Sequence, residues 1–226
     1  MYTLLKSEVG SFPEPVFPQG IDLGEEERKA RFRLYPVSVV YAVQLAAVLA
    51  LSVGYGHGWR GLAFLALGVL IWGPVEYLAH RHVLHGVFPR GDSRYSRVLH
   101  YLFDASHADH HARPWDGLYV NGHLDTLIVA GLAMPLSLLA PPWTASVFVA
   151  AVLASYAFEE WVHHALHFWN FDWRYFQYLR RRHLWHHSPR GAYTAYGITS
   201  GLWDVPFGTR IPEAERARLL PARRAA

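Results

Sequence analysis

The sequence predicts an all-α integral membrane protein of one domain, with four transmembrane helices in two hairpins. Three observations support this prediction. Hydrophobic residues make up 52% of the 226 residues and charged residues only 17%, against roughly 25% in soluble domains. The apolar residues gather in four long stretches, and the basic residues are concentrated on one predicted side of those stretches.

The four apolar stretches define the expected transmembrane helices. They cover residues 36–55, 59–79, 124–140 and 143–158. Each stretch approaches the ~20 residues that a helix needs to cross a bilayer core. The last two are the shortest, so helices of a soluble bundle are the alternative for them. Trp59 and Trp143 stand where interfacial aromatic residues are expected.

The basic residues predict the orientation in the membrane. Of the 21 Lys and Arg residues, only Arg60 lies in or beside the short connectors 54–58 and 141–142. Because cytoplasmic loops carry the excess of Lys and Arg, both termini and residues 81–116 are expected in the cytoplasm.

The two ends of the chain carry no further predicted membrane helix. Residues 1–35 contain charges and prolines instead of the apolar run of a signal peptide. They are interpreted as a cytosolic or interfacial leader, in which residues 24–34 form a short charged helix. Residues 210–226 are interpreted as a tail.

The most informative motif is H-x-x-H-H, which occurs at residues 107–111 and again at residues 183–187. With 15 His in the chain, counting matches gives about 0.06 expected occurrences in a random sequence. On a helix, residues three and four apart lie on one face. Neutral imidazole is the commonest metal ligand, so the two motifs indicate a metal centre.

Two histidine pairs stand at the ends of the second and fourth apolar stretches. His163 and His167 are four residues apart, a helical spacing that lets two imidazoles bind one metal. Glu76, one turn before His80, is expected to accept a hydrogen bond from a ligand histidine. The predicted metal ligands are His80, His85, His107, His110, His111, His163, His167, His183, His186 and His187.

The other histidines and the late charged residues have simpler interpretations. His57, His100, His123 and His164 are interpreted as interfacial anchors, and the role of His82 stays open. Arg180, Arg181 and Arg182 are either contacts for anionic head groups or ordinary cytoplasmic charge.

Ten imidazoles suit two metal ions with about five ligands each, whereas one closed zinc site needs four. The chain has no Cys, which excludes thiolate ligands. Imidazole binds zinc, copper, iron and nickel, so the ligands alone do not choose the metal. A site beside acyl chains favours iron, because iron carries out O₂ chemistry and zinc does not.

The chain resembles the membrane-bound fatty acid hydroxylase/sterol desaturase superfamily, and most closely the fatty acid 2-hydroxylases. The resemblance covers about residues 36–209. It rests on the two H-x-x-H-H motifs, the two histidine pairs and the sequence Glu76-Tyr77-x-x-His80. Residues 197–209 are also similar to the closing motif of that family, G-[VI]-T-S-x-x-W-D-x-x-F-G-T. Residues 116–119 depart from the more basic P-x-D-x-x-R-L stretch of the 2-hydroxylases.

The resemblance implies a function as well as a fold. It implies a helical cap in the cytosol, formed by residues 80–120 and 160–209, in which Trp203 and Asp204 are expected to pack behind the metal ligands. It also implies two iron ions, replaceable by zinc in purified protein, between the membrane helices and the cap. It also implies hydroxylation of a lipid C–H bond with O₂ and two electrons, with a fatty acyl chain as substrate and C2 as a candidate position. Residues 1–35 are too few for the cytochrome b5 domain of some members, so a separate electron donor, cytochrome b5-like or a ferredoxin, is expected.

Two other functions remain open at this point. One is hydroxylation or desaturation of a sterol or carotenoid by a related enzyme. The other is a non-enzymatic metal-binding or transport protein, although transporters carry polar residues along their membrane helices. Nothing in the chain indicates nucleic-acid binding. The use of 19 Arg against 2 Lys points to a GC-rich bacterial source and hence to the plasma membrane.

Overall fold

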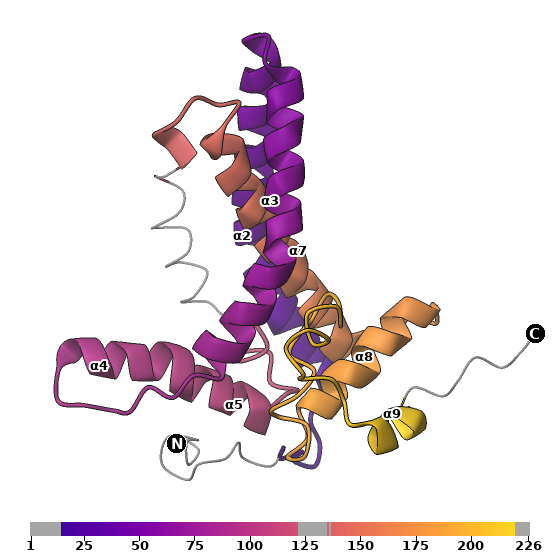
Figure 1. Cartoon of the computed structure of the whole chain (residues 1–226). Helices are drawn as coiled ribbons and strands as arrows, with labels where there is room; N and C mark the ends of the chain where they lie inside the picture. The colour runs from indigo at the N-terminus through magenta and orange to yellow at the C-terminus, as the bar shows by residue number, and fades with distance from the viewer. Residues whose placement is uncertain (1–14, 122–134, 136, 220–226) are drawn as a thin grey trace, which may run out of the picture.

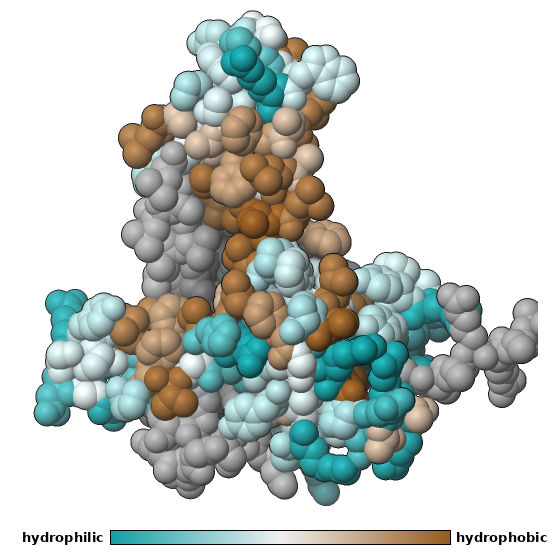
Figure 2. Space-filling model, viewed as in Figure 1, coloured by the Kyte–Doolittle hydropathy of each residue, from teal (hydrophilic) through white to brown (hydrophobic). Residues whose placement is uncertain are grey.

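The computed structural model describes residues 15–121, 135 and 137–219, and the regular structure within these residues is helical. Three long helices form a column, and the shorter helices gather at one end of it (Figure 1). The column consists of α2 (Leu23–Gly54), α3 (Gly58–Leu78) and α7 (Ala145–Phe168). All three are long and apolar enough to cross a membrane, counting α3 with its continuation to Leu84. Figure 2 shows hydrophobic side chains along the column and hydrophilic ones at its two ends.

The predicted helices compare with these elements as follows. The helix expected at residues 59–79 is α3, almost to the residue. The helix expected at residues 143–158 continues ten residues further, to Phe168, because its polar last turns are buried by the cap and carry the histidine pair. The helix expected at residues 124–140 lies almost wholly outside the described residues, so the fourth span remains a prediction.

The first membrane helix begins earlier than predicted. Residues 24–34 and the first apolar stretch form one helix of 32 residues that contains Pro36. Asp22 caps its start by accepting hydrogen bonds from the backbone N–H groups of Gly24 (2.9 Å) and Glu25 (3.1 Å). The expectation of a separate short helix was therefore wrong. Proline disfavours a helix interior, but contacts with the cap hold the first turns in line with the rest of α2.

Those contacts come from two charged residues on the first turns of α2. The Arg33 guanidinium donates hydrogen bonds to the backbone carbonyls of Gly117 and Leu118. The Glu27 carboxylate accepts one from the indole N–H of Trp169, at 3.2 Å. The start of α2 is thus packed against the cap through these side chains.

Small residues allow the column helices to approach closely. A Cβ on Gly68 of α3 would lie 2.6 Å from the Cβ of Ala151 and 2.7 Å from the carbonyl oxygen of Phe148, both on α7. A Cβ on Gly61 would lie 3.0 Å from the Cβ of Ser52 on α2. Close approach at small residues is a common way to pack helices in lipid, and here it fixes α3 against both neighbours.

The cap is built from the short helices at one end of the column. They are η1 (Ala79–Leu84), α4 (Arg94–Leu99), η2 (His100–Ala105), α5 (Ser106–Ala112), α8 (Arg174–His186) and α9 (Glu213–Leu219). The η1 segment continues α3 with the wider turn of a π-helix, and the backbone N–H of His85 bonds the carbonyl of His80 at 3.0 Å. This wider turn brings residues five apart onto one face, which explains the spacing of His80 and His85.

Candidate metal centre

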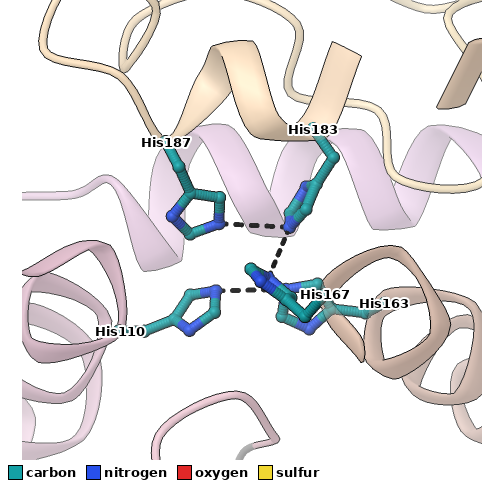
Figure 3. Close-up of side chains that lie close together, drawn as sticks. All are labelled: His110, His163, His167, His183 and His187. Atoms are coloured by element: carbon teal, nitrogen blue, oxygen red, sulfur yellow. Dashed lines mark hydrogen bonds between the residues drawn. The ribbon is translucent and has the colours of Figure 1, made fainter. Parts of the chain in front are cut away.

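Five histidines converge between α5, α7 and α8. This five-histidine group consists of His110, His163, His167, His183 and His187 (Figure 3). The Nε2 atoms of successive members lie 3.1 Å apart for His110 and His163, and 2.8 Å apart for His167 and His183. All five offer a ring nitrogen within 4.8 Å of the others.

A second group lies beside the first, where α3 and η1 meet α5 and α8. This four-histidine group consists of His80, His85, His107 and His186. The Nε2 atoms of His85 and His186 are 3.0 Å apart. The ring centroids of His85 and His107 are 4.7 Å apart, so this group also brings together three segments that are distant in sequence.

The two H-x-x-H-H motifs each contribute to both groups. His107 belongs to the four-histidine group and His110 to the five-histidine group. In the second motif, His186 belongs to the four-histidine group, and His183 and His187 belong to the five-histidine group. Each motif helix lies between the two groups, so one helical face serves both sites. The sequence indicated the shared face but not this division.

His111 lies at the boundary between the two groups. Its ring centroid is 4.4 Å from that of His187 in the five-histidine group and 4.8 Å from that of His107 in the four-histidine group. The side chain is buried. Among the ten predicted ligands, all of which the structure describes, His111 is the one that belongs to neither group.

The nitrogen separations fit bound metal ions. Nitrogens that each bind one ion at 2.0–2.1 Å lie roughly 3 Å apart, and several separations here fall between 2.8 and 3.1 Å. Two rings are also fixed from behind. His80 Nδ1 lies 2.5 Å from the carbonyl oxygen of Tyr196, and His186 Nδ1 lies 2.7 Å from that of Thr194. An Nδ1–H that donates to a carbonyl leaves Nε2 available for a metal.

The electrostatic environment keeps these rings neutral. Burial, followed by the proximity of other histidines, lowers the pKa of His110, His183 and His187 well below the ordinary value. Burial likewise lowers the pKa of His186. Metals bind imidazole in its neutral form, so the burial of the groups favours metal binding at neutral pH.

The remaining histidines lie outside the two groups. His164 is buried, with Nε2 3.2 Å from a Glu27 carboxylate oxygen, and His100 Nδ1 lies 2.7 Å from the Phe88 carbonyl oxygen. Both therefore join parts of the fold and are not interfacial anchors. His57 packs on Trp143 at the far end of the column, with ring centroids 4.1 Å apart. His82 is exposed, and the expectation for residue 123 lies outside the described residues.

Glu76 does not bond a ligand histidine as predicted. Its carboxylate accepts hydrogen bonds from the backbone N–H groups of Ile198 (2.5 Å) and Thr199 (2.9 Å), and from the Thr199 hydroxyl. The acceptors behind His80 and His186 are backbone carbonyls of residues 194–196, which no side-chain pattern in the sequence could indicate. Glu76 supports the two histidine rings indirectly, because its hydrogen bonds hold the segment that carries those carbonyls.

A buried ion pair holds the same segment from its other side. Arg182 pairs with Asp204, and both side chains are buried. Asp204 also accepts hydrogen bonds from the backbone N–H of Tyr196 (2.9 Å) and from the Thr209 hydroxyl (2.8 Å). Arg182 is therefore not a contact for lipid head groups. The expected packing role of Asp204 agrees with these bonds.

A cavity of about 290 Å³ opens onto both histidine groups. Its walls include His80 and His107 from the four-histidine group, and His110 and His163 from the five-histidine group. Another part of the wall comes from residues 118–121, from Glu159 and Glu160 of α7, and from Arg33 of α2. This wall depends on loop and helix contacts between distant segments, so the sequence alone did not identify it.

Comparison with known proteins places the chain in a family. Residues 65–209, which include all ten predicted ligands and the segment 197–209, match the family model for fatty acid hydroxylases. The chain belongs to the fatty acid hydroxylase family. A dihydroceramide fatty acyl 2-hydroxylase of Arabidopsis thaliana is 32% identical over 178 residues, 77% of this chain and 72% of the plant protein. The rat fatty acid 2-hydroxylase is 33% identical over 67% of this chain.

The similarity of this chain to its relatives extends over different fractions of their lengths. The chain spans 40% of the rat protein and 51% of a ceramide very long chain fatty acid hydroxylase of Schizosaccharomyces pombe, to which it is 27% identical. A solved structure of full-length scs7p, in which only the hydroxylase domain is visible, has the same fold. It aligns with a TM-score of 0.66 at 23% identity, over 79% of this chain and 67% of that one.

Proposed function

We propose that this fatty acid hydroxylase family member uses two iron ions, O₂ and two electrons to hydroxylate a fatty acyl chain. One observation carries the proposal most directly. Nine histidines form two adjacent groups with metal-ligand spacing, and both groups line one cavity where three apolar helices meet the cap. The names of the relatives support position C2 of the acyl chain as the site of hydroxylation.

In the proposed reaction, a lipid C–H bond, O₂, two electrons and two protons give a C–OH group and water. Iron, when bound, supplies the O₂-dependent redox chemistry that protein side chains lack. The ten histidines would hold the two ions, and His111, whose ring lies between the two groups, would complete the ligand set. The carbonyls of Thr194 and Tyr196 orient two of the rings. The cavity walls hold the acyl chain against both sites and limit access of water.

The proposed arrangement in the membrane follows from the charge pattern. Four membrane helices form two hairpins, and both termini and the cap lie in the cytoplasm, on the basic side. The acyl chain enters from the bilayer, because the cavity lies at the ends of the apolar helices. A separate protein, cytochrome b5-like or a ferredoxin, supplies the electrons. The arginine-rich composition supports a bacterial plasma membrane as the location.

The proposal can be tested with one histidine variant from each group. His110→Ala removes a member of the five-histidine group, and His186→Ala removes a member of the four-histidine group. Each purified variant should hold less iron than the unaltered protein, by elemental mass spectrometry. Each should also abolish the acyl species one oxygen atom heavier in the lipids of expressing cells, by lipid mass spectrometry.

His57→Ala is the matched control, because His57 lies on a connector at the far end of the column, where its ring packs on Trp143. This variant should retain metal and product. Hydroxylated product in either test variant would contradict the proposal. Oxygen confined to sterols or carotenoids would favour a different substrate within the superfamily. Bound metal without any oxidised lipid would favour a non-enzymatic metal-binding protein.

A further inference from the structure

Residues 200–208, here named the apolar loop, expose hydrophobic side chains on the outside of the cap. Leu202 is 66% exposed, Val205 is 50% exposed and Phe207 is 43% exposed. The one charged residue in this stretch, Asp204, is 1% exposed and is neutralised by its pair with Arg182. Contiguous exposed apolar side chains mark an interaction surface, so the position of the loop indicates its partner.

The apolar loop lies beside the membrane helix α3. The indole nitrogen of Trp203 lies 3.0 Å from the position that a Cβ on Gly73 would take, which places the indole against α3 at this glycine. The ring of Phe207 stacks on that of Tyr77, with centroids 4.8 Å apart. Gly73 lies five residues before the end of α3 at Leu78, which is about 8 Å along a helix axis. The gold segment beside the lower part of α3 in Figure 1 includes this loop.

The surroundings of the apolar loop are those of a membrane interface. Leu70 and Leu78, exposed on α3, belong to a helix apolar enough to span a membrane. Tyr175, at the start of α8, is also exposed and donates a hydrogen bond to the Thr199 carbonyl at 2.8 Å. Arg81 lies near Phe207, and Arg210 is exposed directly after the loop. Aromatic and basic residues flanking an apolar surface are typical of the head-group region of a bilayer.

We propose that the apolar loop inserts into the leaflet in which α3 ends and anchors the cap to lipid. The occupant of this surface is the bilayer and not another protein, because the loop continues the lipid-facing surface of α3. The apolar loop is also connected to the metal centre. Glu76 bonds Thr199, and Tyr196 bonds His80, so the segment that enters the lipid is continuous with the segment that orients a ligand histidine.

The absence of cysteine from the chain makes a direct test possible. Leu202→Cys and Val205→Cys each provide a single site for an environment-sensitive fluorophore. The labelled full-length protein is reconstituted into phosphatidylcholine vesicles with and without brominated acyl chains. Leu70→Cys, on the exposed face of α3, is the control for lipid contact. Arg190→Cys, at an exposed position beside Glu215 of α9, is the control for water.

Both loop labels should emit at shorter wavelength than the Arg190→Cys label. Brominated chains should quench them at least half as strongly as they quench the Leu70→Cys label. Metal content equal to that of the unlabelled protein shows that each variant is folded. Loop labels that behave like the Arg190→Cys label would overturn the proposal. A shift to shorter wavelength without quenching by brominated lipid would also overturn it, because another protein surface would then cover the loop.

Discussion

At the scale of single residues, the metal centre depends on groups that orient the ligands as much as on the ligands themselves. His80 and His186 are held from behind by backbone carbonyls. Those carbonyls belong to the segment that Glu76 and Asp204 fix through four backbone N–H groups. A carboxylate that bonds several backbone N–H groups positions a segment precisely, because each bond constrains a different peptide plane.

We predict that Asp204→Asn strongly destabilises the protein. The substitution keeps the shape of the side chain but leaves the buried Arg182 guanidinium without a negative partner. Breaking a buried pair in this way costs about 3–5 kcal/mol, which chemical unfolding in detergent measures. The control is Glu215→Gln, which breaks an ion pair with the exposed Arg190 and should cost less than about 1 kcal/mol. Equal effects of the two substitutions would contradict the prediction.

At the scale of helices, local spacing accounts for the histidine pairs, whereas packing between distant segments accounts for the course and the close approach of the long helices. The i, i+4 pair on α7 and the i, i+5 pair on η1 follow from turns of different width. The continuity of α2 through Pro36 does not follow from local preference, because it depends on cap residues about 85 to 140 positions away. The close approach of α3 to α7 likewise depends on a glycine facing a neighbour from a distant part of the sequence.

We predict that Gly68→Ala weakens the packing of α3 on α7. The added methyl group would lie 2.6 Å from the Cβ of Ala151 and 2.7 Å from a backbone oxygen, so the helices must separate. Overpacking of this kind costs about 1–3 kcal/mol, seen as a lower Tm in detergent. The matched control is Gly54→Ala at the end of α2, where an added Cβ meets nothing within 4 Å. An unchanged Tm for Gly68→Ala would refute this account of the contact.

At the scale of the whole molecule, the two histidine groups join segments that are far apart in the sequence. His80 and His186 are separated by 106 positions, yet their ring centroids are 4.7 Å apart. The five-histidine group joins α5, α7 and α8. A metal ion bound to the five-histidine group would therefore link α7 of the membrane column to the cap, and one bound to the four-histidine group would link α5 and α8 to η1, which continues α3.

We predict that metal removal destabilises the whole protein. A ligand that binds only the folded state stabilises it by about 4 kcal/mol at a concentration 1,000 times its Kd. Treatment with a chelator should therefore lower the Tm, and added iron should restore it. The control is the double variant His110→Ala with His186→Ala, which has fewer ligands in each group and whose Tm should fall less in chelator. An unaltered protein with the same Tm in chelator and in iron would contradict the prediction.

The sequence by itself determined the features that depend on local spacing and composition. Apolar length located three column helices, with ends in error where polar turns are buried by the cap. Histidine spacing identified the ten candidate ligands, because three to five residues span one helical turn. Only the tertiary structure decided which histidines face one another, that His111 lies between the groups, and that backbone carbonyls support His80 and His186. It also placed the cavity wall and the apolar loop. These features arise where distant segments meet, and local spacing carries no information about such contacts.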